Sequence, residues 1–80
     1  MWQEKDNKLT NTLEFKGFSE AANFITLIAK EADKMNHHPD VFLHEYNKLE
    51  ISLTTHDEGK VTEKDHQLAK KIDQLYNKQG

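Results

Sequence analysis

Five histidines supply most of the acid–base chemistry that this sequence can offer near neutral pH. Three of them lie where ordered elements are expected to end: His37 and His38 directly before Pro39, and His56 after a pair of threonines. An imidazole has an unperturbed pKa of about 6.5, so it can give or take a proton under these conditions. General acid–base catalysis of this kind contributes about 10²–10⁴-fold to a rate. If the two segments meet at one rim of a sheet, the three imidazoles line one small pocket.

Two carboxylates are candidates to fix the tautomer of a histidine and to favour its charged form. Asp33 lies one helical turn before His37, and Asp65 lies in the first turn of the last expected helix. The spacing of Thr62 and Asp65 also resembles a capping box with Asp in place of Glu, so a purely structural role for Asp65 fits equally well. A polar rim without chemistry is the corresponding alternative for the three histidines, and it is the commoner one for isolated histidines.

A metal site is the rival chemistry, because neutral imidazole is a common zinc ligand. The three histidines together with Asp33 could in principle supply the ligands. Neighbouring residues of an extended segment point in opposite directions, however, and no two of the three have the i, i+4 spacing of helical zinc motifs. We therefore expect no metal. His44, which alternates along a strand, and His66, in the first turn of a helix, are expected to be surface residues.

Composition argues against several other kinds of site. All eleven basic residues are lysine, so the chain lacks the planar arginine fork that grips phosphate or guanine in two places. The net charge of −3 and the pI of about 5.9 also argue against nucleic-acid binding. Without cysteine there is no thiol nucleophile, iron–sulfur cluster or thiolate zinc site. No signal peptide is evident, and the longest apolar stretch, residues 24–29, is short, so we expect a cytoplasmic protein without a membrane span.

Four segments carry the alternation or the turn signals of β-strands. In the last of them, apolar and polar residues alternate from Leu49 to Leu53, as in a sheet with one covered face. Asp6 and Asn7 tolerate the left-handed backbone of a tight hairpin turn, and a second tight turn is expected near Asn47. The expected strands cover residues 2–5, 9–15, 41–46 and 48–55.

Two segments have the apolar spacing of amphipathic helices. The first is expected to be capped by Ser19, to run to Met35 and to stop before Pro39, which disfavours α conformation in the preceding residue. The second begins after Thr62. Two helices on one face of a four-stranded antiparallel sheet are the simplest way to bury both stripes, so we expect a two-layer α+β fold of order β-β-α-β-β-α. Residues 1–80 are expected to form one domain.

The expected hydrophobic core is thin. Leu, Ile, Val and Phe account for 18 of the 80 residues, which is just above the level of about 20% below which a highly charged chain stays disordered. A chain this short buries only about 60% of its unfolded surface, and no disulfide compensates. We therefore expect further burial between subunits.

The motif residues closely resemble the signature of the pterin-4a-carbinolamine dehydratases. The likeness extends over about residues 15–73 and is specific, because an acidic residue, a His-His-Pro, an aromatic, a further His and an Asp recur at the family's spacing. Among the departures from the pattern, Val41 stands where relatives often have Trp, so a stacking wall for a pterin would come from Phe42 or be missing. The matching segments are Asp33-Lys34-Met35-Asn36-His37-His38-Pro39, Tyr46, Thr54-Thr55-His56 and Thr62-Glu63-Lys64-Asp65.

The resemblance implies a hydro-lyase that removes water from a 4a-hydroxytetrahydropterin without a metal or other cofactor and so recycles tetrahydrobiopterin. It implies assembly into homodimers or homotetramers. One histidine would protonate the departing 4a-hydroxyl while another accepts a ring N–H proton. The positions carried over are catalytic His37, His38 and His56, pterin-binding Asn36, Thr54, Thr55 and Asp57, and supporting Asp33, Pro39 and Asp65.

Two other functions are alternatives to the dehydratase. Some relatives act as dimerisation partners of other proteins, so the fold could serve as a non-catalytic interaction module. The pocket could also take a related pterin, such as one linked to molybdenum-cofactor metabolism. A phosphorylated pterin would then have to be bound by lysine or by backbone N–H groups, since the chain has no arginine.

Overall fold

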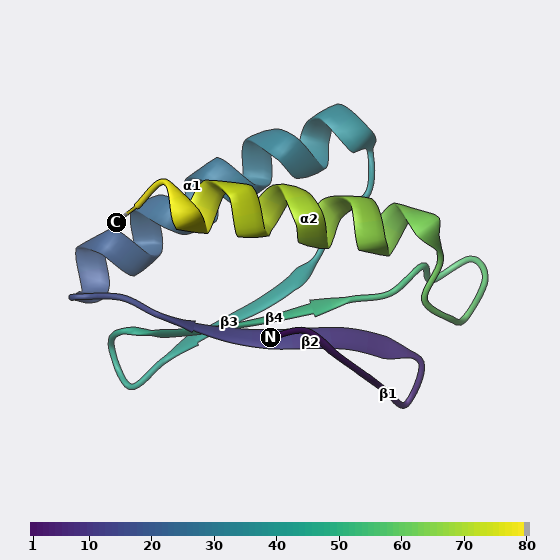
Figure 1. Ribbon diagram of the computed structural model, residues 1–80, viewed down its shortest axis with the longest axis horizontal. Helices are drawn as coiled ribbons and strands as arrows, with labels where there is room; N and C mark the ends of the chain where they lie inside the picture. The colour runs from purple at the N-terminus through teal and green to yellow at the C-terminus, as the bar shows by residue number, and fades with distance from the viewer. Residues whose placement is uncertain (80) are drawn as a thin grey trace.

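Two helices lie side by side on one face of a four-stranded antiparallel sheet, as Figure 1 shows for the computed structural model, which describes residues 1–79. The elements follow the order β-β-α-β-β-α, so the predicted two-layer α+β fold is confirmed. Neither helix within these residues combines the length and the apolar character needed to cross a membrane. The elements are β1 (Gln3–Lys5), β2 (Lys8–Glu14), α1 (Phe18–Met35), β3 (Asp40–His44), β4 (Lys48–Leu53) and α2 (Glu63–Asn77).

The strand order of the sheet is β1-β2-β4-β3, so β1 and β3 form its edges. The pairing of β2 with β4 sets Leu9 opposite Leu53 and Leu13 opposite Leu49, and all four side chains are buried. Because successive side chains of a strand point to opposite faces, this register directs one apolar row toward the helices and leaves the other face polar. The covered face and the polar face predicted for the last strand are therefore confirmed.

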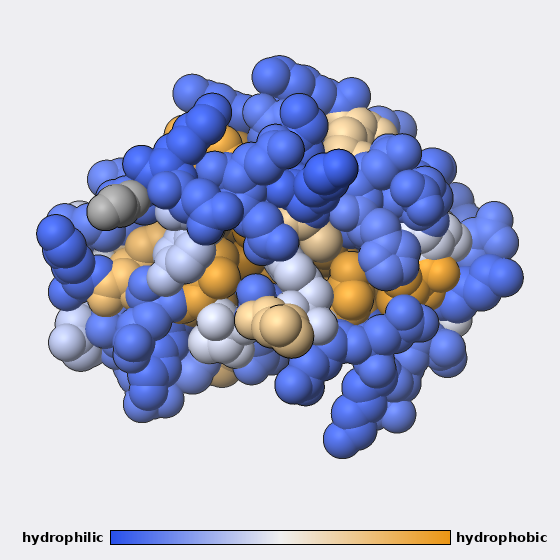
Figure 2. Space-filling view, in the orientation of Figure 1, coloured by the Kyte–Doolittle hydropathy of each residue, from blue (hydrophilic) through white to orange (hydrophobic). Residues whose placement is uncertain are grey.

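The helices cover the apolar face of the sheet with side chains at helical spacing. Phe24 and Ile28 of α1 and Ile72 of α2 are almost completely buried. The ring of Phe24 also packs against two partly buried rings, with centroid distances of 5.1 Å to Phe15 and 5.9 Å to Tyr76. In Figure 2 the surface is mainly hydrophilic, and apolar side chains show along the seam between the helices and the sheet.

Helix α1 begins earlier than the sequence predicts. Its N-cap is Gly17 rather than Ser19, because the backbone of Gly17 is extended and its carbonyl oxygen accepts a hydrogen bond from the N–H of Ala21 at 3.2 Å. Ser19 lies inside the first turn, where it is exposed. The predicted cap is therefore wrong, whereas the predicted end of the helix at Met35, before Pro39, is confirmed.

The second hairpin is tighter and its strands are shorter than predicted. Glu45 and Tyr46 both have a left-handed backbone, with φ of 49° and 55°, so they form the turn and β3 ends two residues earlier than expected. Strand β4 ends at Leu53 because pairing stops there on the β2 side and already at Ser52 on the β3 side. Residues 54–55, predicted as the end of this strand, lie instead in the loop that follows it.

The first hairpin turns at Asp6 and Asn7, as predicted, and both residues have a left-handed backbone. Strand β1 begins at Gln3 rather than at Trp2. The indole N–H of Trp2 instead donates a hydrogen bond to the Asp73 carboxylate of α2 at 2.9 Å, and its ring packs against the core. Trp2 therefore fastens the edge of the sheet to the helical layer.

Truncation of Phe24 should strongly destabilise the fold. Phe24→Ala removes a fully buried ring from the centre of an aromatic cluster, and we expect the free energy of unfolding to fall by about 3–5 kcal/mol. Urea denaturation followed by circular dichroism measures the change. Asn23→Ala, at an exposed position of the same helix, is the matched control and should stay within about 0.5 kcal/mol of the wild type. Equal effects of the two substitutions would contradict the described core.

Candidate active site

The end of α1, the residues after β4 and the start of α2 meet at one end of the two layers (Figure 1). They enclose an open hollow of about 210 Å³. All three motif histidines line it, so the two segments that carry them do share one rim. Its lining residues are Asn36, His37, His38, Thr54, Thr55, His56, Asp57 and Lys64.

The backbone at the end of α1 turns both neighbouring histidines out of the helix. Asn36 has a left-handed backbone, with φ of 51° and ψ of 41°, and its N–H donates to the carbonyl oxygen of Asp33 at 3.2 Å. The N–H of His37 reaches back to the carbonyl oxygen of Ala32 at 3.1 Å. Asparagine tolerates this conformation better than most residues other than glycine. Asn36 therefore has a clear structural role in addition to its place in the hollow.

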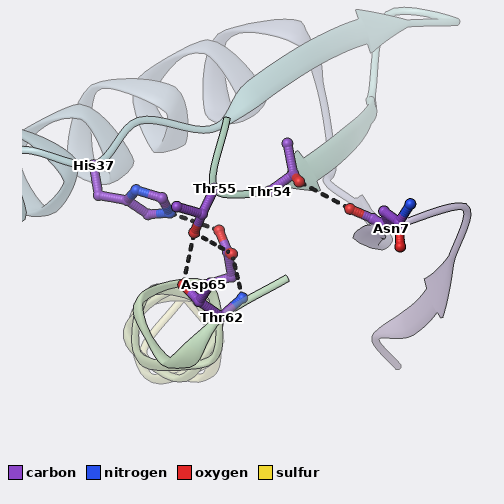
Figure 3. A network of polar contacts seen from close by, with 6 residues as sticks. All are labelled: Asn7, His37, Thr54, Thr55, Thr62 and Asp65. Atoms are coloured by element: carbon purple, nitrogen blue, oxygen red, sulfur yellow. Dashed lines mark hydrogen bonds and ion pairs between the residues drawn. The ribbon is translucent and has the colours of Figure 1, made fainter. Parts of the chain in front are cut away.

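His37 forms a short hydrogen bond with a buried carboxylate. Its Nε2 lies 2.6 Å from Oδ1 of Asp65, whose side chain is fully buried, while the His37 side chain is 11% exposed. The other carboxylate oxygen, Oδ2, accepts hydrogen bonds from the Thr55 hydroxyl at 2.8 Å and from the Thr62 N–H at 2.9 Å (Figure 3). Asp65 completes the predicted capping box of α2 and contacts a motif histidine as well. Asp65 therefore has both roles that the sequence left as alternatives, the helix cap and the partner of a histidine.

The hydrogen bonds around Asp65 keep it ionised. Burial by itself would raise the pKa of this carboxyl group, but the hydrogen bonds from His37, Thr62 and Thr55 outweigh that cost and lower the pKa. An ionised carboxylate can only accept hydrogen bonds. The proton between the two side chains therefore belongs to Nε2 of His37, which leaves Nδ1 as the atom at which this imidazole can exchange protons.

His38 has a different and more exposed carboxylate partner. Its Nε2 lies 2.8 Å from Oδ1 of Asp33, and the two side chains are 56% and 75% exposed. Asp33 was a candidate to orient His37 or another histidine, and it contacts His38 alone among them. A polar contact this exposed contributes little to stability. Its effect is to bias the orientation of the His38 ring.

His56 and Asp57 lie on a tight loop directly after Thr55. The loop closes through a hydrogen bond from the Thr55 N–H to the Lys60 carbonyl at 3.1 Å and one from the Gly59 N–H to the Thr55 carbonyl at 2.9 Å. Gly59 has φ of 68°, a conformation that favours glycine. The closed loop presents both side chains to solvent at the rim of the hollow.

Two threonines of the hollow use their hydroxyl groups within the protein. The buried Thr55 hydroxyl donates to Asp65. The Thr54 hydroxyl donates to the backbone carbonyl of Asn7 in the first hairpin turn at 2.8 Å, as Figure 3 shows. Both residues were expected at a pterin, and both line the hollow, but the hydrogen atom of each hydroxyl is already engaged.

One candidate residue lies away from the hollow, and one residue without a predicted role in the site lines it. Phe42, one of the two alternatives for a stacking wall, does not line the hollow, because alternation along β3 turns it to the outer face of the sheet, where its ring stacks on that of His44 with a centroid distance of 4.9 Å. Lys64, which was not among the predicted site residues, also lines the hollow. Its position next to Asp65, in the first turn of α2, was the available signal. His66 is exposed, as expected.

The carboxylates draw the two adjacent imidazoles apart. His37 turns its Nε2 to Asp65 and His38 turns its Nε2 to Asp33. Among residues 1–79, no group of three or more histidine, aspartate or glutamate side chains is arranged to hold a metal ion. The arrangement of these side chains is suited to proton transfer at the edge of a polar hollow.

The family model described as pterin 4 alpha carbinolamine dehydratase matches residues 1–75. A relative from Sulfurisphaera tokodaii, provisionally named a pterin-4-alpha-carbinolamine dehydratase, is 50% identical over 74 residues, which cover 92% of this chain and 78% of the relative. A relative from a Picosynechococcus species with the same provisional name is 43% identical over 92% of this chain and 79% of its own length.

Two solved structures share the fold. The crystal structure of a transcriptional coactivator/pterin dehydratase from Brucella melitensis has a TM-score of 0.85 and 38% identity, covering 92% of this chain and 80% of that one. A pterin dehydratase-like protein identified as a RuBisCO assembly factor in the alpha-carboxysome has a TM-score of 0.73 at 18% identity, over 94% of this chain and 86% of that one. At that identity the second likeness concerns the fold alone.

Removal of the Asp65 charge should alter how stability depends on pH. Because the pKa of Asp65 is lower in the folded than in the unfolded chain, its network stabilises the fold above the unfolded-state value of about 3.9 and loses that effect as the pH falls through the folded-state value. We expect Asp65→Asn to lower the free energy of unfolding at neutral pH by about 1–3 kcal/mol. The difference from the wild type should shrink below about pH 4.

Urea denaturation at a series of pH values measures this difference. Asp33→Asn, which changes an exposed partner of a histidine in the same way, is the matched control and should have little effect on stability at any pH. A difference between the wild type and Asp65→Asn that stays constant down to about pH 2 would show that the charge of Asp65 does not stabilise the fold.

Proposed function

This chain belongs to the pterin 4 alpha carbinolamine dehydratase family, and we propose that it removes water from a 4a-hydroxytetrahydropterin to give a quinonoid dihydropterin. The observation that carries the proposal is the arrangement of His37, His38 and His56 around one hollow. Two segments that are well separated in the sequence thus contribute three groups able to exchange protons near neutral pH. A family match alone would name the fold, whereas this arrangement supports the reaction.

Dehydration of a carbinolamine needs two proton transfers at neighbouring atoms. An acid protonates the hydroxyl group on carbon 4a, and the carbon–oxygen bond breaks to release water. A base takes the proton from the ring nitrogen bonded to this carbon, and the electrons of the N–H bond form the new carbon–nitrogen double bond. The acid loses one proton and the base gains one, so the reaction needs two imidazoles in opposite protonation states. No electrons are exchanged with another molecule, so the proposed reaction uses no redox cofactor.

The three histidines are the proposed acid–base groups, and their partners decide which atoms are available. His37 exchanges protons through Nδ1, because Nε2 is held by the buried Asp65. His38 is oriented by Asp33, and Pro39 follows it in the segment between α1 and β3. The residues proposed to bind the pterin ring are Asn36, Thr54, Thr55 and Asp57, to which we add Lys64 because it lines the same hollow.

Assembly into a homodimer or homotetramer in the cytoplasm is part of the proposal. Several large apolar side chains are exposed in the single chain, among them Phe42, at 59%, and Val41 on the edge strand β3. Phe18 and Tyr46, at the other end of the molecule from the hollow, are exposed to a similar degree. Their burial between subunits would add to a core that is small for an independent domain.

His56→Ala tests the proposal. We expect it to slow the loss of 4a-hydroxypterin absorbance about 10²–10⁴-fold while circular dichroism and thermal unfolding stay unchanged, because His56 is exposed and lies in a loop. His66→Ala is the matched control, since His66 is an exposed histidine of α2 outside the hollow, and it should retain the wild-type rate. Equal rates for the wild type and His56→Ala would overturn the assignment.

Pterin titration separates the dehydratase from the alternatives. A chain that binds no pterin at millimolar concentration, and whose three histidines can be replaced without loss of its oligomer, would be an interaction module instead. Tighter binding of a pterin that carries a phosphate, lost in Lys64→Gln, would favour a related phosphorylated pterin as the substrate. The proposed function predicts binding of an uncharged tetrahydropterin analogue that competes with the reaction.

A further inference from the structure

We propose that Thr55 and Thr62 are positioning residues whose hydroxyl groups form a one-way hydrogen-bond chain that holds the Asp65 carboxylate on His37. The inference rests on the function proposed above, because it concerns the proton-exchanging atom of a proposed catalytic histidine. It assigns a role in the reaction to Thr62, which the sequence marks only as the cap of a helix. It also assigns the Thr55 hydroxyl group to positioning, which leaves the other atoms of Thr55 for the proposed pterin contact.

The hydrogen-bond chain is continuous from the cap of α2 to the imidazole of His37. Oγ1 of Thr62 lies 2.6 Å from Oγ1 of Thr55, which in turn lies 2.8 Å from Oδ2 of Asp65. Oδ1 of the same carboxylate lies 2.6 Å from Nε2 of His37. Thr55 and Asp65 are both buried, so water does not readily replace either group (Figure 3).

The number of hydrogen atoms on these groups allows only one direction of donation along the hydrogen-bond chain. A threonine hydroxyl has a single hydrogen atom, and an ionised carboxylate has none. The Thr55 hydrogen must therefore point to Asp65, because the carboxylate can only accept. The contact between the two hydroxyl groups then requires that the Thr62 hydrogen points to Thr55. Thr62 thus donates to Thr55 and Thr55 donates to Asp65. Hydrogen bonds linked in this manner strengthen one another.

Two groups besides the histidine hold the carboxylate directly. Oδ2 accepts from the Thr55 hydroxyl and the Thr62 N–H, so rotation of the Asp65 side chain would break two hydrogen bonds in a buried place. Oδ1 therefore remains directed at Nε2 of His37. The imidazole is held in the tautomer that carries its proton on Nε2, and Nδ1 is left for the substrate.

Thr62 takes part in both helix capping and histidine positioning. The N–H of Thr62 donates to Asp65 whatever side chain Thr62 carries, so a valine there keeps this half of the capping box. It removes the hydroxyl group, and with it the half in which this oxygen accepts from the backbone N–H of Asp65. Valine has nearly the shape of threonine, whereas serine keeps the hydroxyl and loses only a methyl group. Thr→Val and Thr→Ser at the two positions thus distinguish loss of the hydrogen bond from loss of packing.

Nuclear magnetic resonance of ¹⁵N-labelled imidazoles is the primary test, since it needs no substrate. In the wild type the Nε2–H proton of His37 should resonate far downfield and exchange slowly with water, as expected for a short hydrogen bond to a buried carboxylate. Thr55→Val should move the signal upfield and speed its exchange, and Thr55→Ser should restore it. Thr62→Val should produce a smaller change in the same direction.

Thr54→Val is the matched control for this signal. Thr54 is adjacent in sequence and lines the same hollow, but its hydroxyl donates to the Asn7 carbonyl and not to Asp65. The His37 signal should therefore be unchanged in Thr54→Val. If Thr55→Val fails to fold, Thr62→Val carries the test, because it leaves the Thr62 N–H and the Thr55 hydroxyl in place.

Kinetics give the second readout. Thr55→Val should lower kcat about tenfold, as other partners of catalytic groups do, with KM changed less than kcat, and Thr55→Ser should recover most of the rate. An unchanged His37 signal in folded Thr55→Val and Thr62→Val would overturn the positioning role. A wild-type chain with the expected signal but without dehydratase activity would overturn the proposed function instead, so the two failures are distinguishable.

Discussion

The buried carboxylate of Asp65 is the constraint on which the candidate site depends. It accepts hydrogen bonds from the segment after α1, from the loop after β4 and from the N-cap of α2, so it joins three parts of the chain at one end of the two layers. A buried charge is costly unless its hydrogen-bonding capacity is filled. Satisfying it requires the three parts to meet in one arrangement, and that arrangement also forms the hollow lined by the three histidines.

The rest of the fold makes this meeting point available. The apolar rows of β2 and β4 and the stripes of the two helices set the distance between the layers. The left-handed Asn36 ends α1 so that His37 points back toward α2, and the loss of sheet partners beyond Leu53 frees the next residues to bend toward the same place. Packing thus brings the end of α1, the loop after β4 and the start of α2 together, and the polar network fixes their relative orientation.

Proteins that share this fold differ in the functions given to them, so function depends on the site. A RuBisCO assembly factor of the alpha-carboxysome shares the architecture at 18% identity, and a Brucella melitensis relative is described as both a coactivator and a pterin dehydratase. One architecture therefore accompanies different descriptions, as is common for small folds. In this chain the three histidines and their two carboxylate partners are the features that favour proton-transfer chemistry.

Residue types and their periodicity were enough to determine the element order, the covered face of the sheet and both hairpin turns, because these depend on local spacing. They also placed the motif histidines near the ends of elements. Sequence did not reveal that Asp33 pairs with His38 while Asp65, 28 positions from its partner, pairs with His37. Nor did it show that Phe42 turns away from the hollow or that Lys64 lines it. Those choices depend on distances between segments far apart in the chain, and only the packing of the helices on the sheet determines such distances.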